Sequence, residues 1–183
     1  MILREVDRPP GPILICDYNP EWPKQFETQS VLIRSALGGL VLSLNHVGST
    51  AVPGLAAKPI IDVTIMVSNP EHESRYLPQL EGIGYKLVVR APEWFEHRML
   101  KSAASDVNLH VFPPECPEVD RMLLFRDWLR RNPEDVRLYA KSKRLLATRD
   151  WSQVQDYADA KQTVIDAIMA RAQAASAGHP PKL

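Results

Sequence analysis

The sequence carries no excess of charge and has no long hydrophobic run. Lys and Arg together number 22, Asp and Glu also number 22, and the formal net charge at pH 7 is zero. A neutral chain creates no overall field that attracts nucleic acid or an acidic membrane, so we expect no nucleic-acid partner. No apolar run approaches the roughly 20 residues of a membrane-spanning helix, and the N-terminus has no apolar signal-like segment. We therefore expect a cytoplasmic protein with no membrane attachment.

Cysteine is also scarce. The two cysteines, Cys16 and Cys116, lie far apart and lack the paired spacing of a metal site. Cys116 lies between Glu115 and Pro117, which provide no neighbouring base or cation to activate a thiol. We predict neither a disulfide framework nor a catalytic cysteine, as is usual in a reducing cytoplasm.

Residues 46–67 combine small residues, a lysine and an acid. The stretch reads His-Val-Gly-Ser-Thr-Ala-Val-Pro-Gly-Leu-Ala-Ala-Lys-Pro-Ile-Ile-Asp-Val-Thr-Ile-Met-Val. Gly48 permits a sharp turn or a close approach to a ligand. Ser49 or Thr50 can then cap a short helix whose free amides face an anion. A proline on either side limits this helix and keeps Lys58 near its end.

Asp62 is the only acid in a β-branched run, residues 60–67, that we predict to be a central strand. Side chains alternate along a strand, so Asp62 and Thr64 share one face. A carboxylate in such a strand is costly unless a cation meets it. A metal ion or a lysine is the natural candidate.

The ordered sequence from His46 to Asp62 is similar to the signature of the GrpB family, also called UPF0157. The resemblance implies an α/β (α+β) fold of the nucleotidyltransferase superfamily, with a mixed-sheet core like that of DNA polymerase beta and a C-terminal helical part. In that core a Gly-Ser helix start holds nucleotide phosphates, and acids on adjacent strands hold magnesium ions. Gly48, Ser49 and Asp62 match this pattern residue by residue. The superfamily expects a second acid where this chain has Thr64.

The superfamily also expects a third acid on a later strand, where this chain presents Asn108 or His110 in a predicted strand at 107–112. One carboxylate makes a poor two-magnesium site, because magnesium prefers oxygen ligands. Asp62 and His110, with His46 as a third ligand, better suit zinc, manganese or another transition ion. Alternatively, His110 is a general base on an acceptor hydroxyl or a structural core histidine. His46 is equally well explained as a hydrogen-bond partner of the turn backbone.

Two lysines interrupt apolar stripes of the predicted C-terminal helices. Lys143 follows Tyr139 by four residues, and Lys161 follows Tyr157 by four residues. Residues four apart are neighbours on one helix face. A lysine in an apolar stripe needs an anion or a route to solvent. Two copies of the pattern favour a shared cleft where both lysines contact phosphate, and the alternative is that each only extends past the core edge.

Other basic residues are weaker candidates. Arg126 and Arg130 lie one turn apart, and guanidinium forks match phosphate oxygens. Salt bridging to a nearby acid such as Asp127 is the commoner role of such arginines, and we predict that role here. His97 and Arg98 face opposite ways on a predicted strand, and Arg98 is a weak candidate for the cleft.

The pattern predicts one domain, with a core over residues 13–114, a helical part over 117–173, and loose termini at 1–12 and 174–183. The expected core elements are strands at 13–16, 60–67, 85–90, 96–103 and 107–112 and helices at 21–38 and 70–82. The expected C-terminal helices run over 117–131, from the Asn132 cap to 147, and from 150 or 152 to 173.

Together these features predict a protein that binds a nucleotide or another phosphorylated small molecule, with a divalent metal (Mg, Mn or Zn) as a candidate cofactor. The first hypothesis is transfer of a nucleotidyl group to a small acceptor. The alternative is a non-catalytic module that has lost metal-binding acids; GrpB-like domains also occur fused to dephospho-coenzyme A kinase, so the resemblance implies a coenzyme A-related ligand. The predicted phosphate- or nucleotide-binding residues are Gly48, Ser49, Thr50, Lys58, Tyr139, Lys143, Tyr157 and Lys161. The predicted catalytic residues are Asp62 and His110, and the predicted metal ligands are Asp62, His110 and His46.

Overall fold

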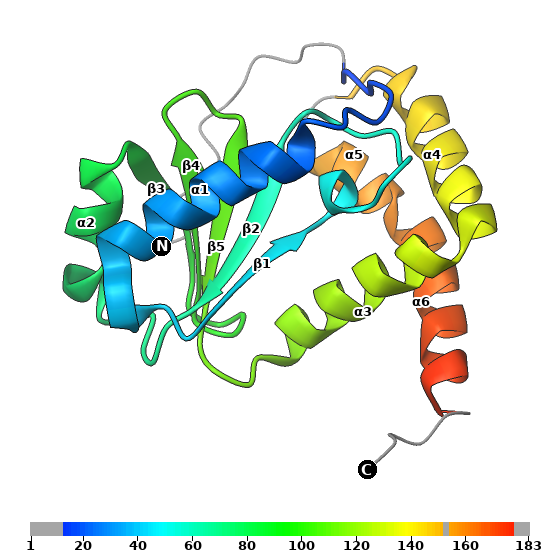
Figure 1. Ribbon diagram of the computed structural model, residues 1–183. Coiled ribbons are helices and arrows are strands. Elements are labelled where there is room, and N and C mark those ends of the chain that lie inside the picture. Colours follow the sequence, from blue (N-terminus) through cyan, green and yellow to red (C-terminus); the bar gives the residue numbers. More distant parts are fainter. Residues whose placement is uncertain (1–12, 152–153, 178–183) are drawn as a thin grey trace.

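The structure is a computed structural model that describes residues 13–151 and 154–177 (Figure 1). The predicted loose segment at 1–12 and the last six residues of the predicted loose tail lie outside the described residues. At the centre is a five-stranded sheet in the order β1-β2-β5-β4-β3. The strands are β1 (Ser43–Val47), β2 (Ile61–Met66), β3 (Tyr85–Ala91), β4 (His97–Ser102) and β5 (Val107–Phe112). Strands β2 and β5 are parallel, and the other neighbours are antiparallel.

One face of the sheet is apolar and is covered by helices α1 (Trp22–Leu37) and α2 (Leu77–Gly82), as Figure 1 shows. Alternate residues of the strands point to this face, so a period of two in the sequence becomes one continuous core. Its fully buried members include Ile33, Val63, Ile65, Leu80, Leu100, Leu109 and Val111.

The opposite face carries polar residues in the middle of the sheet. In the parallel pair β2–β5, Asp62 lies beside Asn108 and Thr64 lies beside His110. Neighbours in register share a face, so these four side chains form one polar group. One face of the sheet therefore packs against helices, and the other carries polar side chains.

Four helices complete the described chain: α3 (Pro117–Arg131), α4 (Pro133–Ala147), α5 (Val154–Ala160) and α6 (Gln162–Ala177). They gather beside the β1 edge of the sheet (Figure 1). Asp135 of α4 links α3 and α6, because its carboxylate accepts hydrogen bonds from Trp128 Nε1 at 2.7 Å and from Arg171 Nε at 3.1 Å. Val52, from the segment after β1, is buried among these helices. That segment therefore joins the sheet to the helical part.

Most predicted elements are confirmed to within two or three residues at their ends, and three predictions were wrong. Residues 13–16 form only a single bridge between Cys16 and Ala57, because no neighbouring strand extends the pairing. The predicted helix at 70–82 is a 3-10 turn, η3 (Glu73–Arg75), followed by α2, and Tyr76 between them has a non-helical φ of −135°. The predicted last helix is two helices, α5 and α6, of which α6 continues to Ala177.

Candidate functional site

The turn after β1 brings its backbone against the carboxylate of Asp62. Gly48 has a φ of +71°, in the left-handed region, and a Cβ atom there would collide with the Asp62 side chain, whose Cγ would lie 3.2 Å away. Only glycine meets both requirements without strain. The sharp turn predicted at Gly48 is therefore present, and its backbone lies against Asp62.

Ser49–Ala51 form a single 3-10 turn, η2, and neither Ser49 nor Thr50 caps it with a side chain, so that prediction was wrong. The Thr50 hydroxyl instead donates to the carbonyl of Ile60 at 3.1 Å. Since its single proton is used there, Thr50 Oγ1 accepts from His46 Nε2, which lies 3.0 Å away. The side chains of Thr50 and His46 thus hold the turn in place.

Two arginines of α3 fix the ends of this turn. Arg126 donates to the carbonyl of His46 at 2.9 Å, and Arg130 donates to the carbonyl of Ala51 at 2.9 Å. Asp127 holds the Arg126 guanidinium with two hydrogen bonds of 2.7 and 3.0 Å. The predicted structural role of both arginines is confirmed, and it consists in positioning the loop that carries Ser49.

Three lysines gather around this loop, and we call Lys58, Lys143 and Lys161 the lysine cluster. Lys143 is 2% exposed and its ammonium donates to Ser49 Oγ at 2.8 Å. Lys161 and Lys58 each place their ammonium over the ring of Tyr157, at 4.7 and 4.6 Å from its centre. Lys143 lies in α4, Lys161 in the turn between α5 and α6 and Lys58 in the loop before β2, so the fold brings together residues more than 100 positions apart.

Two members of the lysine cluster, Lys143 and Lys161, have lowered pKa values. Burial, with the charges of Lys161 and Arg144, lowers the pKa of Lys143 to about 7. Burial, with the charge of Lys58, lowers the pKa of Lys161 to about 8. The Asp62 carboxylate opposes both shifts, so it lies close enough to both lysines to act on them. The structure therefore places Lys143, Lys161 and Asp62 on one side of the molecule, as the sequence predicts.

Two tyrosines line the lysine cluster. Tyr139 carries the Lys143 ammonium over its ring at 4.5 Å from the centre. Tyr157 is 1% exposed, and its hydroxyl has no hydrogen-bond partner among the described residues. A buried hydroxyl without a partner is costly, so this atom is available to a ligand. The pKa of Tyr157 is raised to about 12 by burial, which keeps its proton available as a donor.

Asp62 lies at the border between the lysine cluster and the polar face of the sheet. Its Oδ1 accepts a hydrogen bond from Asn108 Nδ2 at 2.8 Å and lies 4.0 Å from His110 Nε2. The oxygens Asn108 Oδ1 and Thr64 Oγ1 are buried and have no partner among the described residues. The residues that occupy the positions of the missing acids therefore supply neutral oxygens beside a single carboxylate.

His46 does not join this group. It pairs with Val63 across the β1–β2 ladder, so its side chain points to the face opposite Asp62. There its ring stacks on Phe26, with ring centres 4.6 Å apart. Burial and the charges of Arg130 and Arg126 lower the pKa of His46 to about 4, so it is neutral at pH 7. The geometry thus assigns His46 to the turn backbone, one of its two predicted roles, and removes it from a shared metal site.

The donor set does not fit the metal centre that the fold family implies. Within residues 13–151 and 154–177, no three side chains of His, Cys, Asp or Glu converge as metal ligands do. Asp62 is the single carboxylate, and Asn108 turns its amide N–H, not its oxygen, towards it. Two magnesium ions need more carboxylate oxygens than this arrangement provides.

Sequence reasoning missed His97, which lies 3.0 Å from His110, measured from Nε2 to Nδ1. The pairing joins β4 to β5, and only knowledge of the strand register could have revealed it. Arg98, the neighbouring residue, points to the other face and pairs with Glu73 at 2.6 Å. Arg98 therefore takes no part in the candidate site.

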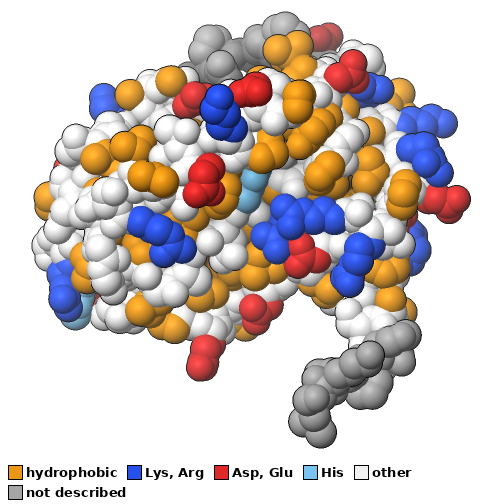
Figure 2. Space-filling model, in the orientation of Figure 1, with side chains coloured by type: hydrophobic (Ala, Val, Ile, Leu, Met, Phe, Trp, Pro, Cys, Tyr) orange, Lys and Arg blue, Asp and Glu red, His pale blue; other side chains and the backbone are white. Residues whose placement is uncertain are grey.

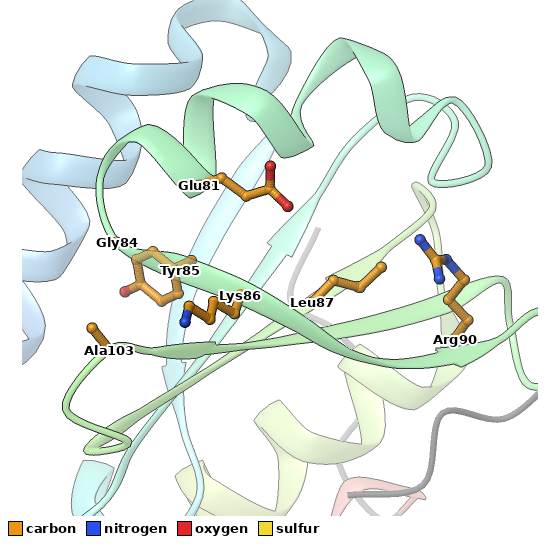
Figure 3. Close-up of a pocket in the computed structure, with 7 residues that line it drawn as sticks. All are labelled: Glu81, Gly84, Tyr85, Lys86, Leu87, Arg90 and Ala103. Atoms are coloured by element: carbon orange, nitrogen blue, oxygen red, sulfur yellow. The ribbon is translucent and has the colours of Figure 1, made fainter. Parts of the chain in front are cut away.

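The surface is hollowed at the β3 edge of the sheet, which is the edge opposite β1. The hollow has a volume of about 570 Å³ and lies between α2 and β3, where Figure 3 shows Glu81, Lys86 and Arg90 around it. Arg90 is already bound to Glu73 at 2.8 Å. On the face in Figure 2, basic side chains are interspersed with acidic and hydrophobic ones and form no continuous basic surface. Of the described helices, none has the length and apolar character that a bilayer crossing needs.

The fold is that of a nucleotidyltransferase-like α/β protein. It has a mixed sheet with helices on one face, a Gly-Ser turn after β1 and an acid at the start of β2. Similar architecture occurs in the Cid1 poly(U) polymerase bound to Mg 3′-dATP, with a TM-score of 0.52, 12% identity, and coverage of 72% of this chain and 44% of that one. At this identity the likeness is one of fold alone.

The chain belongs to the GrpB family, whose family model, described as GrpB protein, matches residues 12–171. A UPF0157 protein of Halalkalibacterium halodurans is 52% identical over 88% of this chain and 83% of the relative. The crystal structure of the conserved protein GrpB from Enterococcus faecalis has a TM-score of 0.77 and 30% identity, covering 87% of this chain and 96% of that one. A dephospho-CoA kinase of Mycolicibacterium paratuberculosis is 27% identical over 83% of this chain and 44% of the kinase.

Proposed function

We propose that this protein binds a phosphorylated small molecule, with a nucleotide as the leading candidate, through the lysine cluster. The observation that carries the proposal is the buried ammonium of Lys143 next to the half-buried Lys161. Among the described residues, neither forms an ion pair with a carboxylate. Burial together with a neighbouring lysine, Lys161 for Lys143 and Lys58 for Lys161, lowers the pKa of each. Buried charges are normally paired, so an anion is the missing partner.

Phosphate is the anion that best suits the surrounding groups. Its oxygens accept several hydrogen bonds, and the cluster offers the ammonium groups of Lys143 and Lys161 and the partner-free hydroxyl of Tyr157. Ser49 already orients Lys143 from the loop side. A bound phosphate would raise the pKa values of the two lysines and so favour their charged forms, which burial disfavours. The charges of the site are therefore balanced only when it is filled.

The single carboxylate favours binding without a metal. Asp62 repels a phosphate placed on the lysines unless a cation intervenes, and the donor set around it does not fit two magnesium ions. In the free protein the Asp62 carboxylate already accepts a hydrogen bond from Asn108, so it has a partner without a metal ion. The proposed function is therefore recognition of a phosphorylated ligand, which corresponds to the module that has lost metal-binding acids.

Isothermal titration calorimetry on the full chain tests this proposal with pyrophosphate, ATP and dephospho-coenzyme A in EDTA. The last ligand is chosen because dephospho-CoA kinases contain a segment similar to this chain. We expect binding that falls at least roughly tenfold in Lys143→Met and Lys161→Met, the effect of losing a charged hydrogen bond. Lys141→Met is the control, because Lys141 is an exposed lysine of the same helix. Absence of binding to all three ligands, or equal binding by the three variants, would refute the proposal.

Nucleotidyl transfer to a small acceptor is the second candidate. It is favoured by the nucleotidyltransferase-like fold and by the position of Asp62 next to the Gly48-Ser49 turn. The test is incubation with labelled nucleoside triphosphates and a metabolite pool in Mg²⁺, Mn²⁺ or Zn²⁺. Label bound to an acceptor together with release of pyrophosphate, both abolished by Asp62→Asn, would establish transfer, and no labelled acceptor with any ion would contradict it.

A further inference from the structure

A hydrogen-bonded pair of histidines lies on the polar face of the sheet beside Asp62. The rings of His97 and His110 stack at 22° with centres 5.2 Å apart. The ring of Phe112 stacks on His97 at 4.7 Å, and the edge of Trp94 meets it at 4.9 Å. His97 is 4% exposed, so aromatic packing holds it in one place.

The turn that leads into His97 is strained. Phe95 and Glu96 have φ values of 55° and 51°, in the left-handed region, and the amide of His97 donates to the carbonyl of Trp94 at 3.1 Å. Turns with two such residues usually contain Asn-Gly, because bulky side chains are disfavoured there. Strain of this kind persists only where the surrounding structure imposes it. Here the turn holds Trp94 against His97.

Hydrogen-bond accounting assigns one proton to each ring. The 3.0 Å contact between His97 Nε2 and His110 Nδ1 holds one proton, and burial lowers the pKa of both histidines, that of His97 to about 3. Suppose instead that His110 Nδ1 donated to His97 Nε2. The proton of His97 would then lie on its buried Nδ1, which has no partner among the described residues. His110 Nε2 would also turn a lone pair towards the Asp62 carboxylate. Both are unfavourable. His97 Nε2–H therefore donates to His110 Nδ1, and His110 carries its proton on Nε2, facing Asp62.

We infer that Asp62 and His110 form a binding subsite for a hydroxyl group of the phosphorylated ligand, and that His97 is a positioning residue for His110. This inference rests on the proposed function, because the phosphate of the same ligand occupies the lysine cluster. It changes the role of His110 from a general base to a hydrogen-bond donor.

The geometry of the pair selects a hydroxyl. Asp62 Oδ1 is an acceptor and His110 Nε2–H is a donor, and the 4.0 Å between them is too long for a direct hydrogen bond. A hydroxyl oxygen can donate to the first and accept from the second, whereas a phosphate oxygen only accepts and an ammonium only donates. Their side chains are 30% and 17% exposed, so a ligand can reach both.

Long-range ¹H–¹⁵N NMR correlation of the full chain at pH 7 tests the proton assignment without any ligand. We expect both histidines to be protonated on Nε2. In His97→Phe, which keeps an aromatic ring but removes the donor, His110 should shift to a mixture of the two neutral forms. His97→Gln keeps an N–H donor at a similar reach and should restore the wild-type form. Protonation of His110 on Nδ1 in the wild type would overturn the inference.

Calorimetry with two matched ligands tests the hydroxyl subsite. Glycerol 3-phosphate and n-propyl phosphate share a phosphate monoester, and only the first bears hydroxyl groups. We expect the wild type and His97→Gln to prefer glycerol 3-phosphate by roughly tenfold, and His97→Phe to lose this preference while still binding propyl phosphate. Equal binding of the two ligands by the wild type overturns this inference alone. Failure of both to bind overturns the proposed function together with it.

Discussion

Replacement of Lys143 by methionine should change how the stability of the protein depends on pH. The pKa of Lys143 is about 7 in the folded protein and 10.5 in the reference state, because burial and neighbouring cations disfavour its charge. The unfolded chain therefore binds more protons than the folded one between these two values. In that range the free energy of unfolding rises with pH, since protonation favours the unfolded state.

The size of the effect follows from the shift. At about 1.36 kcal/mol per pKa unit, the charge of Lys143 destabilises the fold by about 4 kcal/mol at pH 7 and by about 2 kcal/mol at pH 9. The wild type should therefore gain about 2 kcal/mol from this residue over those two pH units. Lys143→Met should lack this gain and should be more stable than the wild type at pH 7.

Urea unfolding followed by circular dichroism at pH 7 and pH 9 measures this difference. The buffers must contain no phosphate, because a bound anion would pair with the lysine and mask the effect. Lys141→Met, an exposed lysine two residues away, should keep the wild-type dependence. If all three proteins gain the same stability on raising the pH, Lys143 is hydrated in the folded state and the reasoning about a buried, unpaired ammonium is wrong.

Three further predictions concern the same site. Pyrophosphate affinity should fall as pH rises from 7 to 9, because Lys143 and Lys161 lose protons in this range. Calorimetry at pH 8 in two buffers of different ionisation enthalpy should show that binding takes up protons. Binding without proton uptake would contradict this prediction. Gly48→Ala should lower the free energy of unfolding by about 1–3 kcal/mol, because its Cβ meets Asp62 and φ stays positive; Gly39→Ala, in open space, is the control for the same urea titration. Asp62→Asn should tighten pyrophosphate binding in EDTA by removing repulsion, and weaker binding would show that the carboxylate contributes to the anion site.

Part of the lysine cluster could be predicted from the local sequence pattern. Tyr139-Lys143 and Tyr157-Lys161 are adjacent because of helical spacing, and the small residues after His46 predict a turn whatever surrounds it. Such features depend on contacts within a few residues, so the sequence alone determined them. The resemblance to the GrpB signature supplied the fold, and similar structures confirm it.

Which groups meet Asp62 was decided only by the tertiary structure. The β1–β2 register turns His46 to the opposite face. The pairing of β2 with β5 places Asn108 and His110 near Asp62, and the pairing of β5 with β4 places His97 beside His110. These neighbours come from hydrogen-bond ladders between strands that are distant in the sequence, and a shift of one residue would reverse every side chain. The sequence by itself indicated most of the strands and helices through their local patterns, and the folded sheet determined which of their residues share a site.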